Sequence, residues 1–188
     1  MTAGRVFPIP ELRTERVGLR PFSRADVPAV AGACSDPETQ KWLPLASPYT
    51  TDVAAQWCGA LAEDLRAAGD GLNLAYVDPA GRLGGSVSLK RTDWRAAVTE
   101  IGYWAVPSMR GRGLTTAAVA MLSSWALQNG MERVELRVSP ANTGSIRVAE
   151  RAGFELEGLL RNAGFTHQGR TDLLCFSVVN ALEPSAGR

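Results

Sequence analysis

The chain has 188 residues, of which 45% are hydrophobic and 21% are charged, and its formal net charge is +1. These values fit one globular domain with a sizeable core, and they give no sign of a general affinity for nucleic acid or membranes. The three cysteines lie far apart, no signal peptide opens the chain and no apolar run reaches membrane-spanning length, so the sequence predicts a cytoplasmic protein without a metal site.

The N-terminal third is predicted to combine one strand, two helices and a proline-rich loop. Residues 1–13 carry two prolines and are expected to form a loose lead-in to a domain that spans 14–180. The stretch 35–49 holds three more prolines around Trp42 and Leu43, which predicts a loop with apolar side chains, of the kind that covers a binding cleft. Alternation, capping residues and a glycine stop predict a strand over 16–21, a helix from 23 to about 33 and a helix from 51 to about 68.

The remaining sequence predicts six strands and two helices. In the longer helix, over 113–129, apolar residues recur at steps of three and four, so one stripe is expected to face a sheet. The stripe consists of Leu114, Ala117, Ala118, Met121, Leu122 and Trp125. The other expected elements are strands at 73–77, 83–91, 98–106, 133–138, 154–160 and 171–179, a helix at 142–152, and a loose end at 183–188. Together the elements predict one α/β (α+β) domain with a mixed sheet of about seven strands and about four helices.

The stretch 99–115 is the most informative part of the chain, because it reads as a strand, a proline break, a glycine-rich basic loop and the start of a long helix. A helix N-terminus carries free backbone N–H groups and the positive end of the helix dipole, which predicts a site for an anion such as a phosphate. The stretch lacks the Gly-Lys-Ser/Thr ending of a P-loop, and Thr116 stands where a dinucleotide fingerprint needs its third glycine. Taken alone, the loop also fits a tight strand-to-helix turn.

Further motifs give this loop a context. They are Leu19–Phe22, the Glu-Ile-Gly-Tyr-Trp run Glu100–Trp104, the Arg-x-x-Gly-x-Thr run Arg110–Thr115, Asn142 with Ser145, Gly153–Phe154 and Glu157–Arg161. In these motifs the chain resembles the GNAT superfamily of acetyl-CoA-dependent N-acetyltransferases, over roughly residues 14–180. It is most similar to the Rim-type branch, which acetylates the N-terminal residue of ribosomal proteins.

The resemblance implies a mostly antiparallel, twisted sheet that splays between its fourth and fifth strands, with acetyl-CoA as co-substrate and no metal. It implies that the pyrophosphate of coenzyme A lies on the backbone N–H groups of Arg110, Gly111, Arg112, Gly113, Leu114 and Thr115. It also implies that the backbone of Trp104, Ala105 and Val106 pairs with the pantetheine arm like an added strand. Asn142 would hydrogen-bond the arm and Ser145 would lie near the sulfur. Thr115 departs from the small Gly or Ala usual at its position.

Two polar residues are candidates for the chemistry of acetyl transfer. Glu100 is the carboxylate nearest in sequence to the splay and is a candidate general base, although a strand-edge glutamate on a solvated face is equally compatible. Since Ala149 stands where many superfamily members have a tyrosine acid, Ser145 is expected to stabilise the leaving sulfur by hydrogen bonding. Helix-capping roles stay open for Ser145 and Asn142. The segment 162–164 holds no carboxylate for the base that some Rim-type enzymes use there.

The acceptor side is the least defined part of the predicted site. Trp42, Tyr49 and Tyr103 are candidates to line it, although aromatic side chains are more often part of a core. His167 is expected on a surface hairpin. The cysteines are expected to be small buried residues: Cys34, Cys58 and Cys175.

The predicted function is transfer of an acetyl group from acetyl-CoA to a primary amine, on a peptide N-terminus or a small molecule, by direct attack in a ternary complex. An α-amine with a pKa of about 8 is neutral about a tenth of the time at pH 7, so it needs little help from a base. Transfer of a longer acyl group such as succinyl, and a non-catalytic acyl-CoA sensor, remain alternatives. A monomer or homodimer is expected, with no nucleic-acid or membrane partner.

Overall fold

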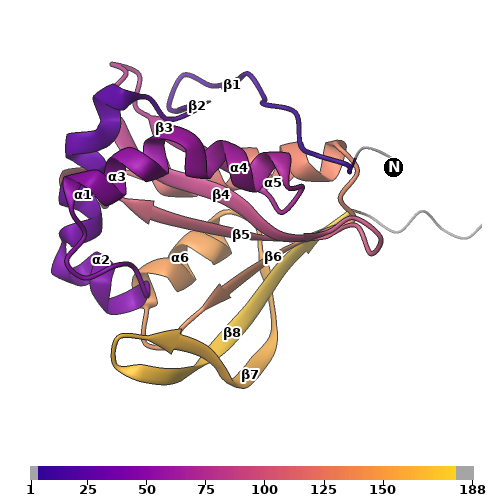
Figure 1. Ribbon diagram of the computed structural model, residues 1–188. Coiled ribbons are helices and arrows are strands. Elements are labelled where there is room, and N and C mark those ends of the chain that lie inside the picture. Colours follow the sequence, from indigo (N-terminus) through magenta and orange to yellow (C-terminus); the bar gives the residue numbers. More distant parts are fainter. Residues whose placement is uncertain (1–3, 181–188) are drawn as a thin grey trace, which may run out of the picture.

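The structure, a computed structural model, describes residues 4–180, in which one eight-stranded sheet carries helices on both faces (Figure 1). The strands are β1 (Leu12–Arg13), β2 (Gly18–Arg20), β3 (Leu72–Val77), β4 (Leu83–Asp93), β5 (Val98–Ala105), β6 (Arg133–Val138), β7 (Glu155–Thr166) and β8 (Gly169–Val179). Their spatial order is β1-β2-β3-β4-β5-β6-β8-β7, and neighbours are antiparallel except for the parallel pair β5 and β6. The predicted class and the mixed, mostly antiparallel sheet are confirmed. The additional strand is the short β1, which pairs with β2.

The helices divide into two groups, with α1 to α4 on one face of the sheet and α5 and α6 on the other (Figure 1). They are η1 (Arg24–Asp26), α1 (Val27–Ser35), α2 (Pro37–Trp42), α3 (Thr51–Gln56), η2 (Trp57–Leu61), α4 (Ala62–Ala67), η3 (Pro107–Met109), α5 (Leu114–Gln128) and α6 (Thr143–Arg151). Within residues 4–180, no helix has both the length and the apolar character needed to span a bilayer.

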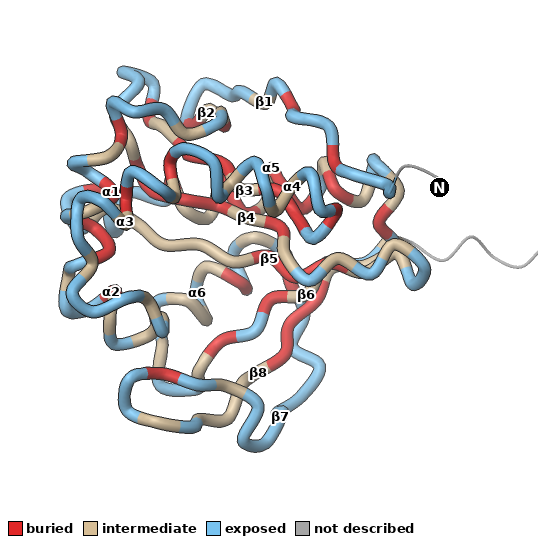
Figure 2. The backbone as a smooth tube through the Cα atoms, viewed as in Figure 1, coloured by how far each residue is buried: buried red, intermediate tan, exposed pale blue. Residues whose placement is uncertain are grey.

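The main core lies between α5 and the centre of the sheet, where the tube of Figure 2 is red along much of β3 and β4, whereas the last part of β5 is tan. The predicted stripe of α5 is confirmed, since Leu114, Ala118 and Leu122 are buried and its other three members pack against the same core. In contrast, β7 is exposed along nearly its whole length, and Figure 2 shows it in pale blue.

The central feature of the sheet is an opening between β5 and β6. The two strands pair in parallel only where Val98–Glu100 of β5 lies beside Arg133–Glu135 of β6. Beyond that point β5 continues to Ala105 and β6 to Val138 while the two diverge (Figure 1). This is the predicted splay, and among residues 4–180 it leaves one edge of the last part of β5 without a partner strand.

The stretch 35–49 is not wholly a loop, because its first half forms α2. The carboxylate of Asp36 accepts a hydrogen bond from the Thr39 N–H at 3.1 Å, and Pro37 occupies the first helical position, where it costs no hydrogen bond. Pro37, which was expected in a loop, therefore starts a short helix, whereas Pro44 and Pro48 lie in the loop. The remaining residues, from Leu43 to Thr50, form the expected loop.

Other boundaries differ less. The helix predicted from 51 to 68 is capped by Thr50 and is interrupted by the π-helical turn η2, inside which Gly59 leaves helical geometry. Strand β7 runs on to Thr166, beyond the predicted end at 160, and places the exposed His167 on a hairpin turn as expected. The expectation of a loose lead-in is wrong at Phe7, which is 1% exposed. The predicted loose end at 183–188 lies outside the described residues.

Asp26 gives the N-terminal helices a pH-dependent anchor. Burial opposes ionisation of its carboxyl group, but hydrogen bonds from Arg20 at 2.7 Å and from the Ser23 N–H at 2.8 Å outweigh burial and lower the pKa of Asp26. A carboxylate with a lowered pKa stabilises the fold above its unfolded pKa of about 3.9, and the stabilisation is lost as the pH falls through the folded value.

We therefore expect Asp26→Asn to lower the free energy of unfolding by about 1–3 kcal/mol at pH 7, and the difference from wild type to shrink below about pH 4. Urea unfolding at several pH values measures both effects. The exposed Asp64→Asn is the matched control and should stay within about 0.5 kcal/mol of wild type. A difference that does not change with pH would contradict the assignment.

Candidate active site

A cavity of about 500 Å³ opens beside the splay of β5 and β6. Three segments line it: α2 with the residue that follows it, the end of β5 with the loop before α5, and the start of α6. The lining residues that were predicted from the sequence are Trp42, Tyr103, Trp104, Ala105, Arg110, Gly111, Thr115, Asn142 and Ser145. The sequence motifs thus come together around one space, although they lie up to 103 residues apart in the chain.

The loop before α5 presents backbone N–H groups that have no hydrogen-bond acceptor among residues 4–180. Gly111 and Gly113 have φ values of +75° and +76°, the left-handed region that favours glycine, and Gly113 is the N-cap residue of α5. No side chain caps this helix end, and the amides from Gly111 to Thr116 donate no hydrogen bond within the described part of the chain. Unpaired amides at a helix N-terminus suit an anion, and the anion site stays a prediction for Gly111 to Thr115. The Arg110 N–H of the predicted set already donates to the Pro107 carbonyl at 3.2 Å.

The end of β5 presents a second set of backbone groups, shifted by one residue from the prediction. Val106 is already used, because its N–H donates to the Gly84 carbonyl at 2.8 Å and its carbonyl accepts from Met109. Backbone groups alternate sides along a strand, so Trp104 also faces β4, whereas Tyr103 and Ala105 face the opening towards β6. The pairing predicted for Trp104, Ala105 and Val106 stays a prediction; of these three residues only Ala105, together with Tyr103, turns its backbone towards the opening.

Arg110 connects the loop to α2 through its side chain. Its guanidinium donates to the Asp36 carboxylate at 2.5 Å and to the Thr39 hydroxyl at 2.9 Å. Burial opposes ionisation of Asp36, but Arg110 and the Thr39 N–H outweigh burial and lower the pKa of Asp36. The Arg110 side chain therefore fixes α2 over the cavity, while the backbone of the loop is left for an anion.

Comparison with known proteins agrees with this geometry. Residues 16–155 match the family model described as the acetyltransferase (GNAT) domain. The chain belongs to the GNAT acetyltransferase family. It is therefore an acetyl-CoA-dependent acyltransferase, and the predicted family and co-substrate are confirmed.

Three relatives illustrate the range of this similarity. The chain is 28% identical over 170 residues to the "Uncharacterized N-acetyltransferase p20" of Bacillus licheniformis, covering 89% of this chain and 95% of that protein. It is 32% identical over 90 residues to the ribosomal-protein-serine acetyltransferase of Escherichia coli (strain K12), covering 47% and 50%. It is 26% identical to the solved structure of Mycobacterium smegmatis RimJ in complex with CoA-disulfide, with a TM-score of 0.77 over 87% and 81% of the two chains.

At the start of α6 in this acetyltransferase, one of the two predicted site residues caps the helix. The Asn142 side chain accepts a hydrogen bond from the Ser145 N–H at 3.0 Å, so its helix-capping role is confirmed. The Ser145 carbonyl accepts from the Tyr103 hydroxyl at 3.3 Å. The Ser145 hydroxyl itself makes no hydrogen bond among residues 4–180 and lines the cavity, so it is available to a ligand. Burial raises the pKa of Tyr103 to about 12, which keeps this phenol protonated at neutral pH.

Glu100 lies in an ion-pair cluster and is not among the residues that line the cavity. Its carboxylate is 2.9 Å from both Lys90 Nζ and an Arg91 guanidinium nitrogen, and 3.8 Å from Arg137 Nε. The carboxylate that does line the cavity is Glu38 on α2, whose Oε1 accepts from Trp42 Nε1 at 2.7 Å. Sequence reasoning missed Glu38 because it treated this segment as a loop.

The remaining predicted acceptor residue, Tyr49, lies elsewhere. It packs against the second core, which Val30, Cys34, Ala54 and Cys58 form between α1, α3 and η2, and burial raises the pKa of its hydroxyl. The cysteines are buried and free, as predicted: Cys34, Cys58 and Cys175. Burial raises the pKa of Cys34 to about 12 and that of Cys58 to about 11, so neither thiol is poised as a nucleophile.

Proposed function

We propose that this acetyltransferase transfers the acetyl group of acetyl-CoA to a primary amine, on a peptide N-terminus or a small molecule, by direct attack in a ternary complex. The observation that carries the proposal is the opening beside β5, which adjoins the unpaired amides of the loop before α5. The amides suit a diphosphate, and the backbone of Ala105 suits the pantetheine arm. Together they would bring the thioester to the cavity that α2 covers.

The residues of the cavity fit the steps of such a transfer. The neutral amine attacks the thioester carbonyl, the C–N bond forms, and the carbonyl oxygen becomes an oxyanion that backbone N–H groups at the splay stabilise. The C–S bond then breaks, and the Ser145 hydroxyl donates a hydrogen bond to the leaving thiolate. The amine proton passes to solvent. An α-amine is neutral about a tenth of the time at pH 7, so this route requires no strong base.

The experiment is a screen for release of free thiol from acetyl-CoA in the presence of peptides and small amines. Peptides with free N-termini form the first arm, because a ribosomal-protein-serine acetyltransferase is among the relatives. Polyamines and aminoglycosides form the second arm, and succinyl-CoA in place of acetyl-CoA tests a longer acyl donor. We expect amine-dependent thiol release from acetyl-CoA. Binding of acetyl-CoA without release for any amine would favour a sensor and would contradict the proposal.

Glu100 provides a test of the predicted general base. Because two cations lie within 2.9 Å of its carboxylate and it does not line the cavity, we expect Glu100→Gln to act on stability. The free energy of unfolding should fall by about 1–3 kcal/mol, with an unchanged pH profile of kcat/KM. Glu135→Gln is the matched control, since Glu135 belongs to the same ion-pair cluster through Arg133 and Arg137. A loss of turnover concentrated below pH 8 in Glu100→Gln alone would identify Glu100 as the base.

A further inference from the structure

Tyr76 is a fully buried side chain that reaches from near the end of β3 to the first turn of α5. Its exposed fraction is 0%. Its hydroxyl lies 2.8 Å from the hydroxyl of Thr115, which comes 39 positions later in the chain. Thr115 also lines the cavity, and its amide is one of the unpaired N–H groups described above. A partly buried hydrogen bond thus ends directly behind the proposed diphosphate site.

Two glycines of β4 make room for the Tyr76 ring. A Cβ atom at Gly84 would lie 2.4 Å from the ring, and a Cβ atom at Gly85 would lie 2.6 Å from the hydroxyl oxygen. Both distances are too short for any side chain, so the two glycines fix where the phenol stands. The same Gly84 accepts the Val106 N–H, which connects the position of Tyr76 to the end of β5.

The Tyr76 hydroxyl is suited to the donor role in this pair. Burial raises the pKa of Tyr76, so the phenol stays protonated at neutral pH. If Tyr76 donates its proton to the Thr115 oxygen, the O–H of Thr115 remains to donate into the cavity, and the two bonds reinforce each other in a chain. A threonine at this position, where the GNAT motif usually has glycine or alanine, is thereby accounted for.

We propose that Tyr76 is a positioning residue for the diphosphate of coenzyme A, acting through Thr115, whose hydroxyl and amide it holds towards the cavity. The inference rests on the proposed function only in that the diphosphate binds at the first turn of α5. Tyr76 touches no substrate, and its effect is confined to ligands that carry the diphosphate.

The test compares CoA with a thioester that lacks the diphosphate. We expect Tyr76→Phe and Thr115→Val each to raise the Kd for CoA, measured by calorimetry, about three- to tenfold. With S-acetyl-pantetheine as donor, kcat/KM should stay within about twofold of wild type. Thr115→Ser keeps the hydroxyl and should bind CoA as wild type does. The double variant should bind no more weakly than Thr115→Val alone, because both changes remove one chain of hydrogen bonds.

A matched control separates positioning from general loss of stability. Thr99 lies at the start of β5, away from the cavity, and is also 0% exposed. Its hydroxyl lies 3.0 Å from the hydroxyl of Thr92 on β4. Thr99→Val should lower the unfolding temperature as Tyr76→Phe does, but leave the Kd for CoA unchanged. An unchanged Kd for CoA in Tyr76→Phe would overturn the inference. So would a fall in kcat/KM with S-acetyl-pantetheine that is as large as the fall in affinity for CoA. If the wild-type protein binds no CoA, the proposed function fails instead.

Discussion

Gly113→Val is expected to abolish CoA binding while the protein stays folded. Gly113 has a φ of +76°, and a β-branched residue there costs about 1–2 kcal/mol in backbone strain and places its side chain among the amides of the loop. An added Cβ meets only an Arg16 guanidinium nitrogen at 3.4 Å, so the fold has room for the change. Because several charge-assisted N–H bonds to a diphosphate are lost, the Kd for CoA should rise about 100-fold or more. Calorimetry measures this Kd.

Gly81→Val is the matched control for this experiment. Gly81 has a φ of +79° in the turn between β3 and β4, with nothing within 4 Å of an added Cβ, and it does not line the cavity. The two variants therefore carry the same backbone strain, and only Gly113→Val should lose CoA. Wild-type affinity in Gly113→Val would show that the loop does not hold the diphosphate.

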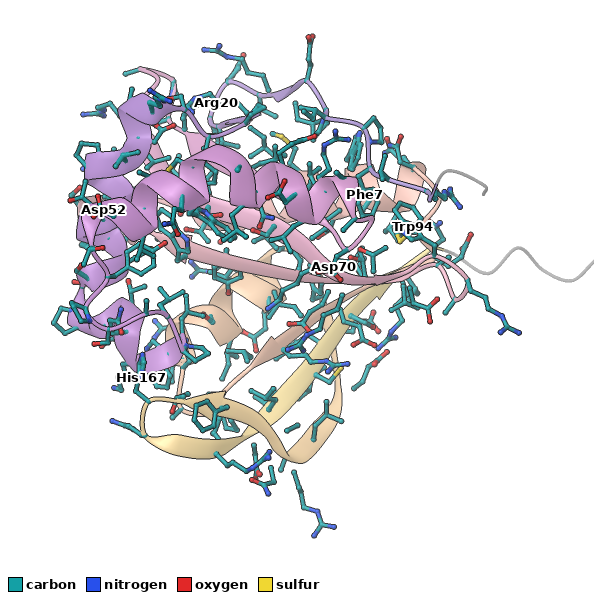
Figure 3. All side chains as sticks on the ribbon, in the orientation of Figure 1. Phe7, Arg20, Asp52, Asp70, Trp94 and His167 are labelled. Carbon is teal, nitrogen blue, oxygen red and sulfur yellow. The ribbon has the colours of Figure 1, made fainter. Side chains whose placement is uncertain are left out.

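Phe7→Ala is expected to destabilise the protein by about 3–5 kcal/mol, the range for removing a large buried aromatic side chain. Phe7 is 1% exposed, and its ring centroid lies 4.5 Å from that of Trp94 and 5.8 Å from that of Trp125. Figure 3 shows Phe7 beside Trp94, at the end of the sheet away from the cavity. The lead-in thus closes one end of the main core.

Urea unfolding measures this effect, with Ile9→Ala as the control. Ile9 lies two residues away and is 48% exposed, so its truncation should cost less than about 0.5 kcal/mol. CoA binding should persist in Phe7→Ala at temperatures where the variant is folded. Equal stability of Phe7→Ala and wild type would restore the interpretation of a loose N-terminal segment.

Features set by local sequence were predictable. The apolar spacing of α5 and the two glycines before it depend on neighbours within a few residues, and the structure places both as expected. The order of the motifs also predicted the splay, because that order is characteristic of one family. These patterns were sufficient to predict the family and its co-substrate.

Features set by distant contacts were not predictable. The burial of Phe7 depends on Trp94 and Trp125, and nothing in residues 1–13 reveals those partners. The pairing of Glu100 with Lys90 follows from the register of β4 and β5, which the sequence did not give residue by residue. For the same reason the proposed acceptor side was the weakest part of the prediction, because the cavity combines α2 with the distant end of β5.

The shared use of Asp36 has an evolutionary consequence. One carboxylate caps α2 and also pairs with Arg110, so the wall of the cavity and the loop before α5 depend on a single anchor. Loss of either partner leaves the other charge without its ion pair, although Thr39 still bonds to each of them. Among homologous chains, an acid at position 36 and an arginine at position 110 should therefore be inherited together, and each should be replaced only when the other is.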